Sequence, residues 1–199
     1  MENICKAVYI NLSRRTDRKD EFEGELKQMD IKALRFPAIE ATPGMIGCHS
    51  SHLSVLKMAR ALKWENVLIF EDDFKFIVDK EVFNVELKRF FDLKMPYDVL
   101  MLAYNINESQ ECNDVVGYAR NVQNAAGYIV HTRFYDKLIE NLEDALPKLK
   151  ETHAHWLYLN DQCWKTLQPL SEWFYLKTRI GIQRPSFSDL AERYMDYGT

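Results

Sequence analysis

The chain has 199 residues, of which 47% are hydrophobic, so it is long and apolar enough for one ordinary domain with a sizeable core. Lys and Arg number 26 and Asp and Glu 30, and the resulting net charge of −4 gives no general attraction for nucleic acid or an anionic membrane. Because the sequence shows neither a run of about 20 apolar residues nor the pattern of a signal peptide, we expect no membrane span and a cytoplasmic protein.

Strand and helix signals alternate along the chain. In the first half of the chain we predict a strand at 6–11, a helix over 16–29, a strand at 33–36, a loop at 37–47, a helix from Ser50 or Ser51 to 63, a strand at 67–70 and a helix at 82–91. In the second half we predict a strand at 98–103, a loop at 104–114, strands at 115–120 and 126–131, and a helix from 132 that Pro147 closes. A short helix over 160–167, a strand at 173–176 and a polar tail from 183 follow. This order predicts a single α/β domain with a largely parallel central sheet flanked by helices.

Polar clusters follow two of the predicted strands. The first covers residues 11–18, and the second covers residues 71–73. Ligands of open α/β sheets bind beyond the carboxyl ends of the strands. We therefore expect both clusters to line one crevice.

Glu71-Asp72-Asp73 is the most informative of these clusters. Three successive carboxylates after a buried strand repel one another unless solvent or a cation screens them. Their hard oxygen atoms suit Mg²⁺ or Mn²⁺, and a nucleotide diphosphate could supply the remaining ligands. The other interpretation is an exposed acidic turn, and the buried strand in front of the cluster favours the metal.

The segment Ser13–Arg18 offers arginines and backbone donors at the start of a predicted helix. Such a segment is either an anion or nucleotide site or an ordinary solvated helix start. Neither a GxGxxG fingerprint nor a P-loop is present in the sequence.

Three further segments carry reactive side chains. Gly47–His52 offers a cysteine, two serines and two histidines, either as nucleophile and base or for helix capping and packing. His153 and His155 alternate, so they either share a face in a strand, where they could bind metal, or belong to a surface segment before Trp156. Asp161 lies among aromatic residues and is either a general base or a helix cap. The four cysteines lack zinc-binding spacing, and we expect reduced thiols.

Taken together, the motifs form an ordered series. They are VYINLSRRTDR at 8–18, PAIEA at 37–41, GCHSSH at 47–52, VLIFEDD at 67–73, GYIV at 127–130, Asp161-Gln162 and RPSFSD at 184–189. This series resembles glycosyltransferase family 25, which includes bacterial lipooligosaccharide galactosyltransferases and collagen β-galactosyltransferases. The resemblance extends from the first strand to about Asp189.

The resemblance implies a GT-A fold, a UDP-sugar donor, Mn²⁺ or Mg²⁺ and inversion at the anomeric carbon. It identifies residues 71–73 as the DxD-type motif, with Asp73 on the metal and Asp72 facing the donor ribose. It makes Asp161 the candidate base, and Asp189 or a histidine would complete the metal site. The donor contacts it implies are Asn11, Leu12, Arg15, Arg18, His52, Glu71 and Asp72.

The implied reaction transfers galactose or glucose to a glycan or to a protein-linked hydroxyl, as in lipopolysaccharide biosynthesis. In one domain over 1–199, residues 1–103 would form the nucleotide-sugar half and 104–199 the acceptor and catalytic half. The tail aromatics Phe187, Tyr194 and Tyr197 pack onto the core, line an acceptor groove or contact a second subunit in a homodimer. The alternative functions are a non-catalytic nucleotide-sugar or glycan-binding module, against which the intact acidic triplet argues, and a Mg²⁺ phosphohydrolase.

Overall fold

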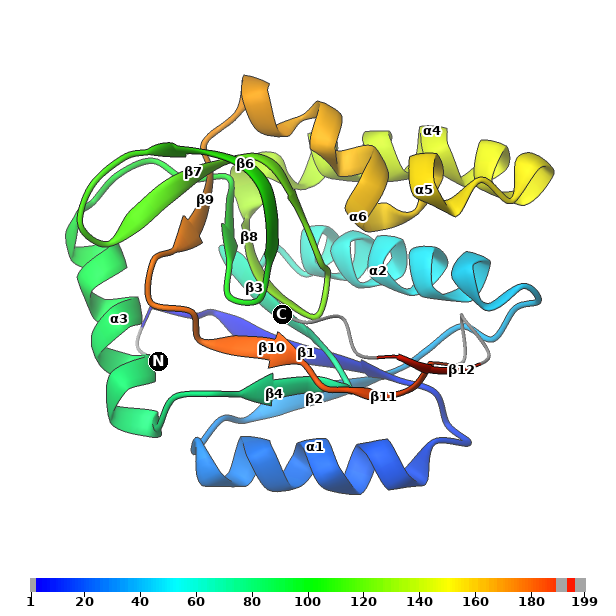
Figure 1. The fold of residues 1–199 in the computed structure, drawn as a ribbon, viewed down its shortest axis with the longest axis horizontal. Coiled ribbons are helices and arrows are strands. Elements are labelled where there is room, and N and C mark those ends of the chain that lie inside the picture. Colours follow the sequence, from blue (N-terminus) through cyan, green and yellow to red (C-terminus); the bar gives the residue numbers. More distant parts are fainter. Residues whose placement is uncertain (1–2, 189–192, 196–199) are drawn as a thin grey trace.

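The central element is a mixed sheet, shown in Figure 1 in a computed structural model that describes residues 3–188 and 193–195. Within these residues the sheet has eight strands in the order β2-β1-β3-β8-β5-β9-β7-β6. The strands are β1 (Lys6–Asn11), β2 (Ala33–Pro37), β3 (Asn66–Glu71), β5 (Val99–Met101), β6 (Asn105–Glu111), β7 (Val116–Gln123), β8 (Gly127–His131) and β9 (Trp173–Leu176).

The expected α/β class with a largely parallel sheet is confirmed. The strand β1 pairs in parallel with β2 and β3, and β5 pairs in parallel with β9. The strand β8 lies between β3 and β5 and runs antiparallel to both, and β7 runs antiparallel to its neighbours β9 and β6. Because β8 follows β7 in the chain yet lies in the middle of the sheet, both halves of the sequence contribute to one continuous sheet.

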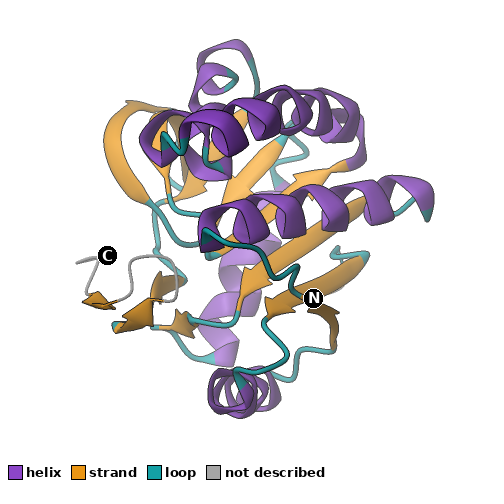
Figure 2. Ribbon diagram, turned by 90° about the vertical axis from the view of Figure 1, so that its right-hand side faces the viewer, coloured by secondary structure: helices purple, strands orange, loops and turns teal. Residues whose placement is uncertain are grey.

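Helices cover the sheet on both faces, as Figures 1 and 2 show. On β1, Val8 and Ile10 pack with α2 and α4, whereas Ala7 and Tyr9 pack with α1 and α3. This alternation explains why the inner strands read as unbroken apolar runs. The helices are α1 (Thr16–Gln28), α2 (Gly44–Ala61), α3 (Lys80–Asp92), α4 (Tyr135–Thr152), α5 (His155–Tyr158) and α6 (Asn160–Cys163), with 3₁₀ turns at Thr132–Phe134, Trp164–Thr166 and Gln168–Leu170.

Two short strand pairs lie beside the main sheet. They are β4 (Phe74–Phe76) with β10 (Gly181–Gln183) and β11 (Ser186–Ser188) with β12 (Arg193–Met195). In the first pair Gln183 lies opposite Phe74. This pairing brings residues 181–183 beside the acidic residues that follow β3.

The loop predicted over 104–114 is wrong, because residues 105–111 form β6 at the edge of the sheet. Six of its seven residues are exposed. An edge strand that faces solvent needs no apolar alternation, so its polar sequence reads as a loop.

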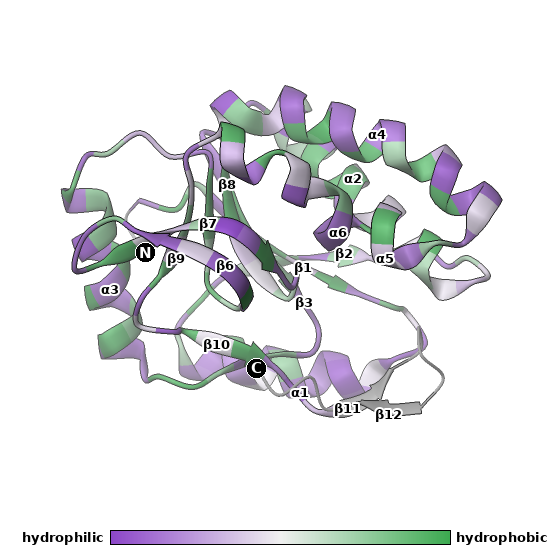
Figure 3. Cartoon of the chain, turned by 45° about the horizontal axis from the view of Figure 1, so that its top comes forward, coloured by the Kyte–Doolittle hydropathy of each residue, from purple (hydrophilic) through white to green (hydrophobic). Residues whose placement is uncertain are grey.

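The prediction that Pro147 closes its helix is also wrong, because α4 continues to Thr152. Pro147 lies on the exposed side of α4, whereas Leu149 beyond it is buried. Proline has no N–H to donate to the carbonyl four residues earlier, and that carbonyl lies on the exposed side of α4, where water can bond to it. Apolar packing beyond Pro147 then stabilises the last turn of the helix. Figure 3 shows this pattern as hydrophobic and hydrophilic residues that alternate along α4.

The helix α2 begins at Gly44, within the predicted loop and ahead of the serines expected to cap it. A Cβ atom on Gly47 would lie 2.2 Å from the carbonyl oxygen of Ile39, so glycine allows α2 to approach that segment closely. Ser51 instead accepts a hydrogen bond from the Ile39 N–H at 2.8 Å and donates one to the Gly47 carbonyl at 2.7 Å. These contacts fix the segment before α2 against the helix.

Candidate active site

A pocket of about 1050 Å³ opens where β1 and β3 end. Ile10 of β1 pairs with Glu71 of β3, so the residues that follow both strands meet at one edge of the sheet. The remaining walls come from residues 38–44, the first turns of α2, the turn at 123–125, and α5 with α6. The expected single crevice at the carboxyl ends of the strands is confirmed.

A network of polar side chains joins the two clusters at this edge. The side-chain amide of Asn11 donates to Asp72 at 2.7 Å, and Arg35 donates to the amide oxygen of Asn11 at 2.9 Å. The guanidinium of Arg18 contacts Asp72 at 3.0 Å and Asp73 at 3.3 Å. Asn11, Asp72 and Asp73 are each no more than 6% exposed, so the network is held in the protein rather than in bulk water.

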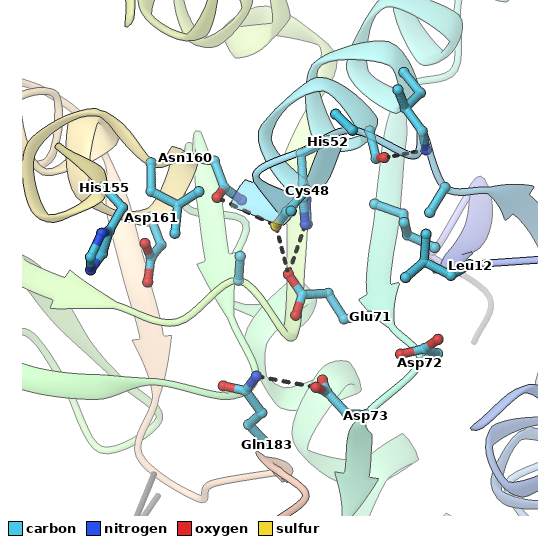
Figure 4. A pocket seen from close by; sticks show the side chains of 18 of the residues that line it. Leu12, Cys48, His52, Glu71, Asp72, Asp73, His155, Asn160, Asp161 and Gln183 are labelled. Atoms are coloured by element: carbon cyan, nitrogen blue, oxygen red, sulfur yellow. Dashed lines mark hydrogen bonds and ion pairs between the residues drawn. The ribbon is translucent and has the colours of Figure 1, made fainter. Parts of the chain in front are cut away.

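Asp73 is the carboxylate that this network satisfies least. Its Oδ2 accepts from Gln183 at 3.2 Å (Figure 4), and its backbone carbonyl accepts from the Arg184 N–H at 2.7 Å. Its buried Oδ1 has no hydrogen-bond partner among residues 3–188. Burial and the charges of Glu71 and Asp72 raise the pKa of Asp73 from its usual 3.8 to about 7. A buried carboxylate oxygen without a hydrogen-bond donor, beside two other carboxylates, is a suitable ligand for a hard divalent cation.

Cys48, His52 and Glu71 form a second cluster on the wall made by α2 and β3. Cys48 and His52 are four residues apart on α2 and therefore share one helix face. The Nε2 of His52 lies 2.9 Å from Oε1 of Glu71, and the thiol of Cys48 lies 3.9 Å from the same oxygen. The other ring nitrogen of His52 lies 2.8 Å from the Tyr128 hydroxyl. Burial, followed by the charge of Glu71, raises the pKa of the Cys48 thiol well above its usual range.

Asp161 lies at the opposite wall, at the start of the four-residue helix α6. Its Oδ2 accepts from the backbone N–H of Asn124 at 3.2 Å, and its Oδ1 accepts from the Gln162 amide at 3.1 Å. Burial raises the pKa of Asp161 above the usual carboxyl range, although both hydrogen bonds oppose the shift. In Figure 4, Asp161 and His155 lie on one side of the pocket and Asp72 on the other.

Most of the predicted site residues meet in this pocket. The predicted residues among its lining are Leu12, Arg18, His52, Glu71, Asp72, Asp73 and Asp161. Asn11 lies behind this surface and contacts Asp72. Arg15 is not among the lining residues, and its guanidinium pairs with Asp17 at 2.8 Å. Asp189 lies outside the described residues.

The strand in which His153 and His155 would share a face does not form. His153 ends α4 in a left-handed conformation with φ of 56°, whereas His155 begins α5 and lines the pocket. Trp156, the next residue, is 63% exposed and also lines the pocket. The aromatic residues that surround Asp161 in the sequence were the signal that could have placed Trp156 in the pocket wall.

Sequence reasoning also missed Gln183 and the backbone of Asn124. Gln183 is 110 residues from Asp73, and only the pairing of β10 with β4 brings them together. Asn124 has a φ of 95°, and its N–H points to Asp161. No local sequence pattern reports either contact.

Comparison with solved structures places this fold among GT-A-like glycosyltransferases. A glycosyltransferase involved in the glycosylation of the major capsid of PBCV-1 matches with a TM-score of 0.59 at 12% identity, covering 95% of this chain and 96% of that one. The glycosyltransferase GlyE from Streptococcus pneumoniae matches with a TM-score of 0.46 at 10% identity, covering 88% of this chain and 46% of that one. At such identities the likeness concerns the fold.

A family model built from sequences identifies the family of this chain. The family model described as glycosyltransferase family 25 (LPS biosynthesis protein) matches residues 40–151, which is more than half of the chain. The chain belongs to glycosyltransferase family 25, so it is a glycosyltransferase, as the sequence motifs predicted. A search of the curated proteins finds no match. In the part of the chain that the structure describes, no helix is both long enough and apolar enough to cross a membrane.

Proposed function

We propose that this glycosyltransferase moves galactose or glucose from a UDP-sugar to a hydroxyl group of a glycan or glycosylated protein, with inversion at the anomeric carbon. The observation that carries the proposal is the network of Asn11, Arg18, Asp72 and Asp73 at the edge of a pocket of about 1050 Å³. A volume of that size suits a large polar ligand such as a nucleotide sugar.

Asp73 is the residue we assign to a divalent cation, either Mn²⁺ or Mg²⁺. Its unpartnered buried oxygen and its raised pKa are what a hard cation would relieve. When bound, such a cation supplies positive charge to the donor diphosphate. Gln183 and the Arg184 N–H hold the Asp73 side chain and backbone in place for that role.

Arg18 and Asn11 prepare the donor side of the pocket. Arg18 places its guanidinium between Asp72 and Asp73, where it offsets two of the three neighbouring carboxylates and can contact a diphosphate oxygen. Asn11 fixes the Asp72 carboxylate, which we assign to the donor ribose, by a 2.7 Å hydrogen bond. Both contacts orient the site before substrate arrives.

Asp161 is the residue we assign as general base. It would take the proton from the acceptor hydroxyl as that oxygen attacks the anomeric carbon of the donor. The N–H of Asn124 and the amide of Gln162 hold its two oxygens, and burial brings its pKa closer to neutrality. Asp161 lies across the pocket from Asp72 (Figure 4), so the proposed base and the proposed donor contact face each other from opposite walls.

Calorimetric titration of UDP into the protein, with Mn²⁺ and then with EDTA, tests the donor site. We expect binding that requires both the metal and Asp73, so Asp73→Ala abolishes it, whereas Asp144→Ala on the exposed face of α4 leaves it intact. Binding of UDP that ignores EDTA and Asp73→Ala would overturn the metal assignment. Transfer from UDP-galactose or UDP-glucose to an acceptor library then separates an enzyme from a binding module.

A further inference from the structure

Cys48, His52 and Glu71 form a cluster on one wall of the pocket, and Cys48 has no role in the proposed transfer reaction. The three residues offer a sulfur, a ring nitrogen and a carboxylate oxygen that all lie within 4.8 Å of one another. All three residues line the pocket. We propose that they form a binding site for a borderline divalent transition metal of the Zn²⁺ class, separate from the cation site at Asp73.

The distances between the three side-chain atoms are close to those between the ligand atoms of a tetrahedral metal ion. Bonds of about 2.3 Å to sulfur and about 2.0–2.2 Å to nitrogen and oxygen separate the ligand atoms of a tetrahedral ion by roughly 3.4–3.6 Å. In the cluster, His52 Nε2 and Glu71 Oε1 are 2.9 Å apart, and Cys48 Sγ and Glu71 Oε1 are 3.9 Å apart. The third pair, Cys48 Sγ and His52 Nε2, lies within 4.8 Å, so side-chain shifts of about 1 Å would bring the set to that geometry.

The scaffold holds the ligands from two directions. Cys48 and His52 follow the i, i+4 spacing of α2, and Glu71 ends β3, so no flexible loop intervenes. The Tyr128 hydroxyl lies 2.8 Å from Nδ1 of His52, and the two rings stack with centroids 5.8 Å apart. A partner on the second ring nitrogen is the usual means of orienting a metal-ligating histidine.

The chemistry of the ligands separates this site from the one at Asp73. Thiolate and imidazole favour Zn²⁺ and Co²⁺, whereas Mn²⁺ and Mg²⁺ prefer the all-oxygen environment of Asp73 and a diphosphate. Three protein ligands leave one coordination position, which faces the pocket because the cluster lines it. On binding, the thiol proton of Cys48 leaves to solvent and the sulfur binds the metal as thiolate. Binding of this metal does not require the UDP-sugar donor.

The test is titration of the reduced 199-residue protein with Co²⁺, followed by optical spectroscopy, and then displacement of the bound Co²⁺ by added Zn²⁺. We expect one equivalent of Co²⁺ to give a near-ultraviolet band from sulfur-to-metal charge transfer and to be displaced by Zn²⁺. Cys48→Ser removes the band, and Cys112→Ser, which changes a half-buried thiol outside the pocket, preserves it. Tyr128→Phe retains the band and weakens binding about tenfold or more, because His52 loses its orienting contact.

Two outcomes concerning Cys48 would overturn the proposal, provided that circular dichroism shows Cys48→Ser to be folded. One is a Co²⁺ complex without a thiolate band, and the other is Zn²⁺ affinity in Cys48→Ser equal to that of the parent protein. Asp73→Asn separates this inference from the proposed function, because it should abolish metal-dependent UDP binding while leaving the band in place. Loss of the band in Asp73→Asn would assign the bound ion to Asp73 and also reject the site.

Discussion

Asn11 and Asp72 are 61 positions apart in the chain and are joined by a buried hydrogen bond of 2.7 Å. Asn11 ends β1 and Asp72 follows β3, and the parallel pairing of these strands brings both to the same edge of the sheet. Arg35, from β2, holds the other end of the Asn11 amide. Three neighbouring strands therefore position one carboxylate of the acidic triplet.

We expect Asn11→Ala to lower the free energy of unfolding by about 1–3 kcal/mol, because the buried Asp72 carboxylate and the half-buried Arg35 guanidinium each lose a hydrogen bond to Asn11. It should also weaken UDP binding, since Asp72 loses its orientation. Urea denaturation and calorimetry measure the two effects. Asn107→Ala on the exposed edge strand is the matched control, and equal stability of both variants would contradict the role given to Asn11.

The sequence predicts the site best where a buried strand ends in polar residues. Residues 67–70 lack any polar position, so both the central strand and the location of Glu71 at its end follow from hydropathy. The same argument places Asn11 after the first strand. Because ligands of such sheets bind beyond the carboxyl ends of the strands, Asn11 and Glu71 could be predicted to lie in one site.

The contacts that hydropathy does not report are the non-local ones. Gln183 reaches Asp73 only because β10 pairs with β4, and the position of β8 between β3 and β5 brings Tyr128 to His52. Side-chain hydrogen bonds of this kind depend on topology rather than on neighbours in sequence. The edge strand β6 was missed for a different reason, because an exposed strand carries no apolar pattern.

Asp73→Asn should stabilise the protein at high pH. The folded-state pKa of Asp73 is raised from 3.8 to about 7, so between these values the folded state binds more protons and stability falls as pH rises. Asparagine does not ionise, so at pH 8 and without metal the variant should exceed the parent by on the order of 2–4 kcal/mol. The gap should close toward pH 4, and urea denaturation at both pH values measures it. If the parent protein were as stable as Asp73→Asn at pH 8, the ionised Asp73 carboxylate would not destabilise the folded state, and the prediction would be wrong.

Gly47 and Gly24 form a matched pair for testing how α2 approaches the pocket wall. In Gly47→Ala the new Cβ would lie 2.2 Å from the Ile39 carbonyl oxygen, so we expect a loss of about 1–3 kcal/mol in stability and weaker UDP binding. Gly24→Ala, inside α1, meets nothing within 4 Å and should gain about 0.5–1 kcal/mol. Thermal and urea unfolding measure both. A neutral Gly47→Ala would show that α2 can shift without cost.

Asp161 sets the pH dependence of transfer if it is the base. A base acts only when ionised, and burial raises its pKa, so the rate should rise with pH through a limb above the usual carboxyl range. Asp161→Asn should lower kcat by about 10²–10⁴ and leave Mn²⁺-dependent UDP affinity unchanged, since Asp161 lies across the pocket from the donor network. Single-turnover rates from pH 5 to 9, beside calorimetry with UDP, measure both effects. Normal turnover in Asp161→Asn would move the base to another residue, and lost UDP binding would place Asp161 in the donor site.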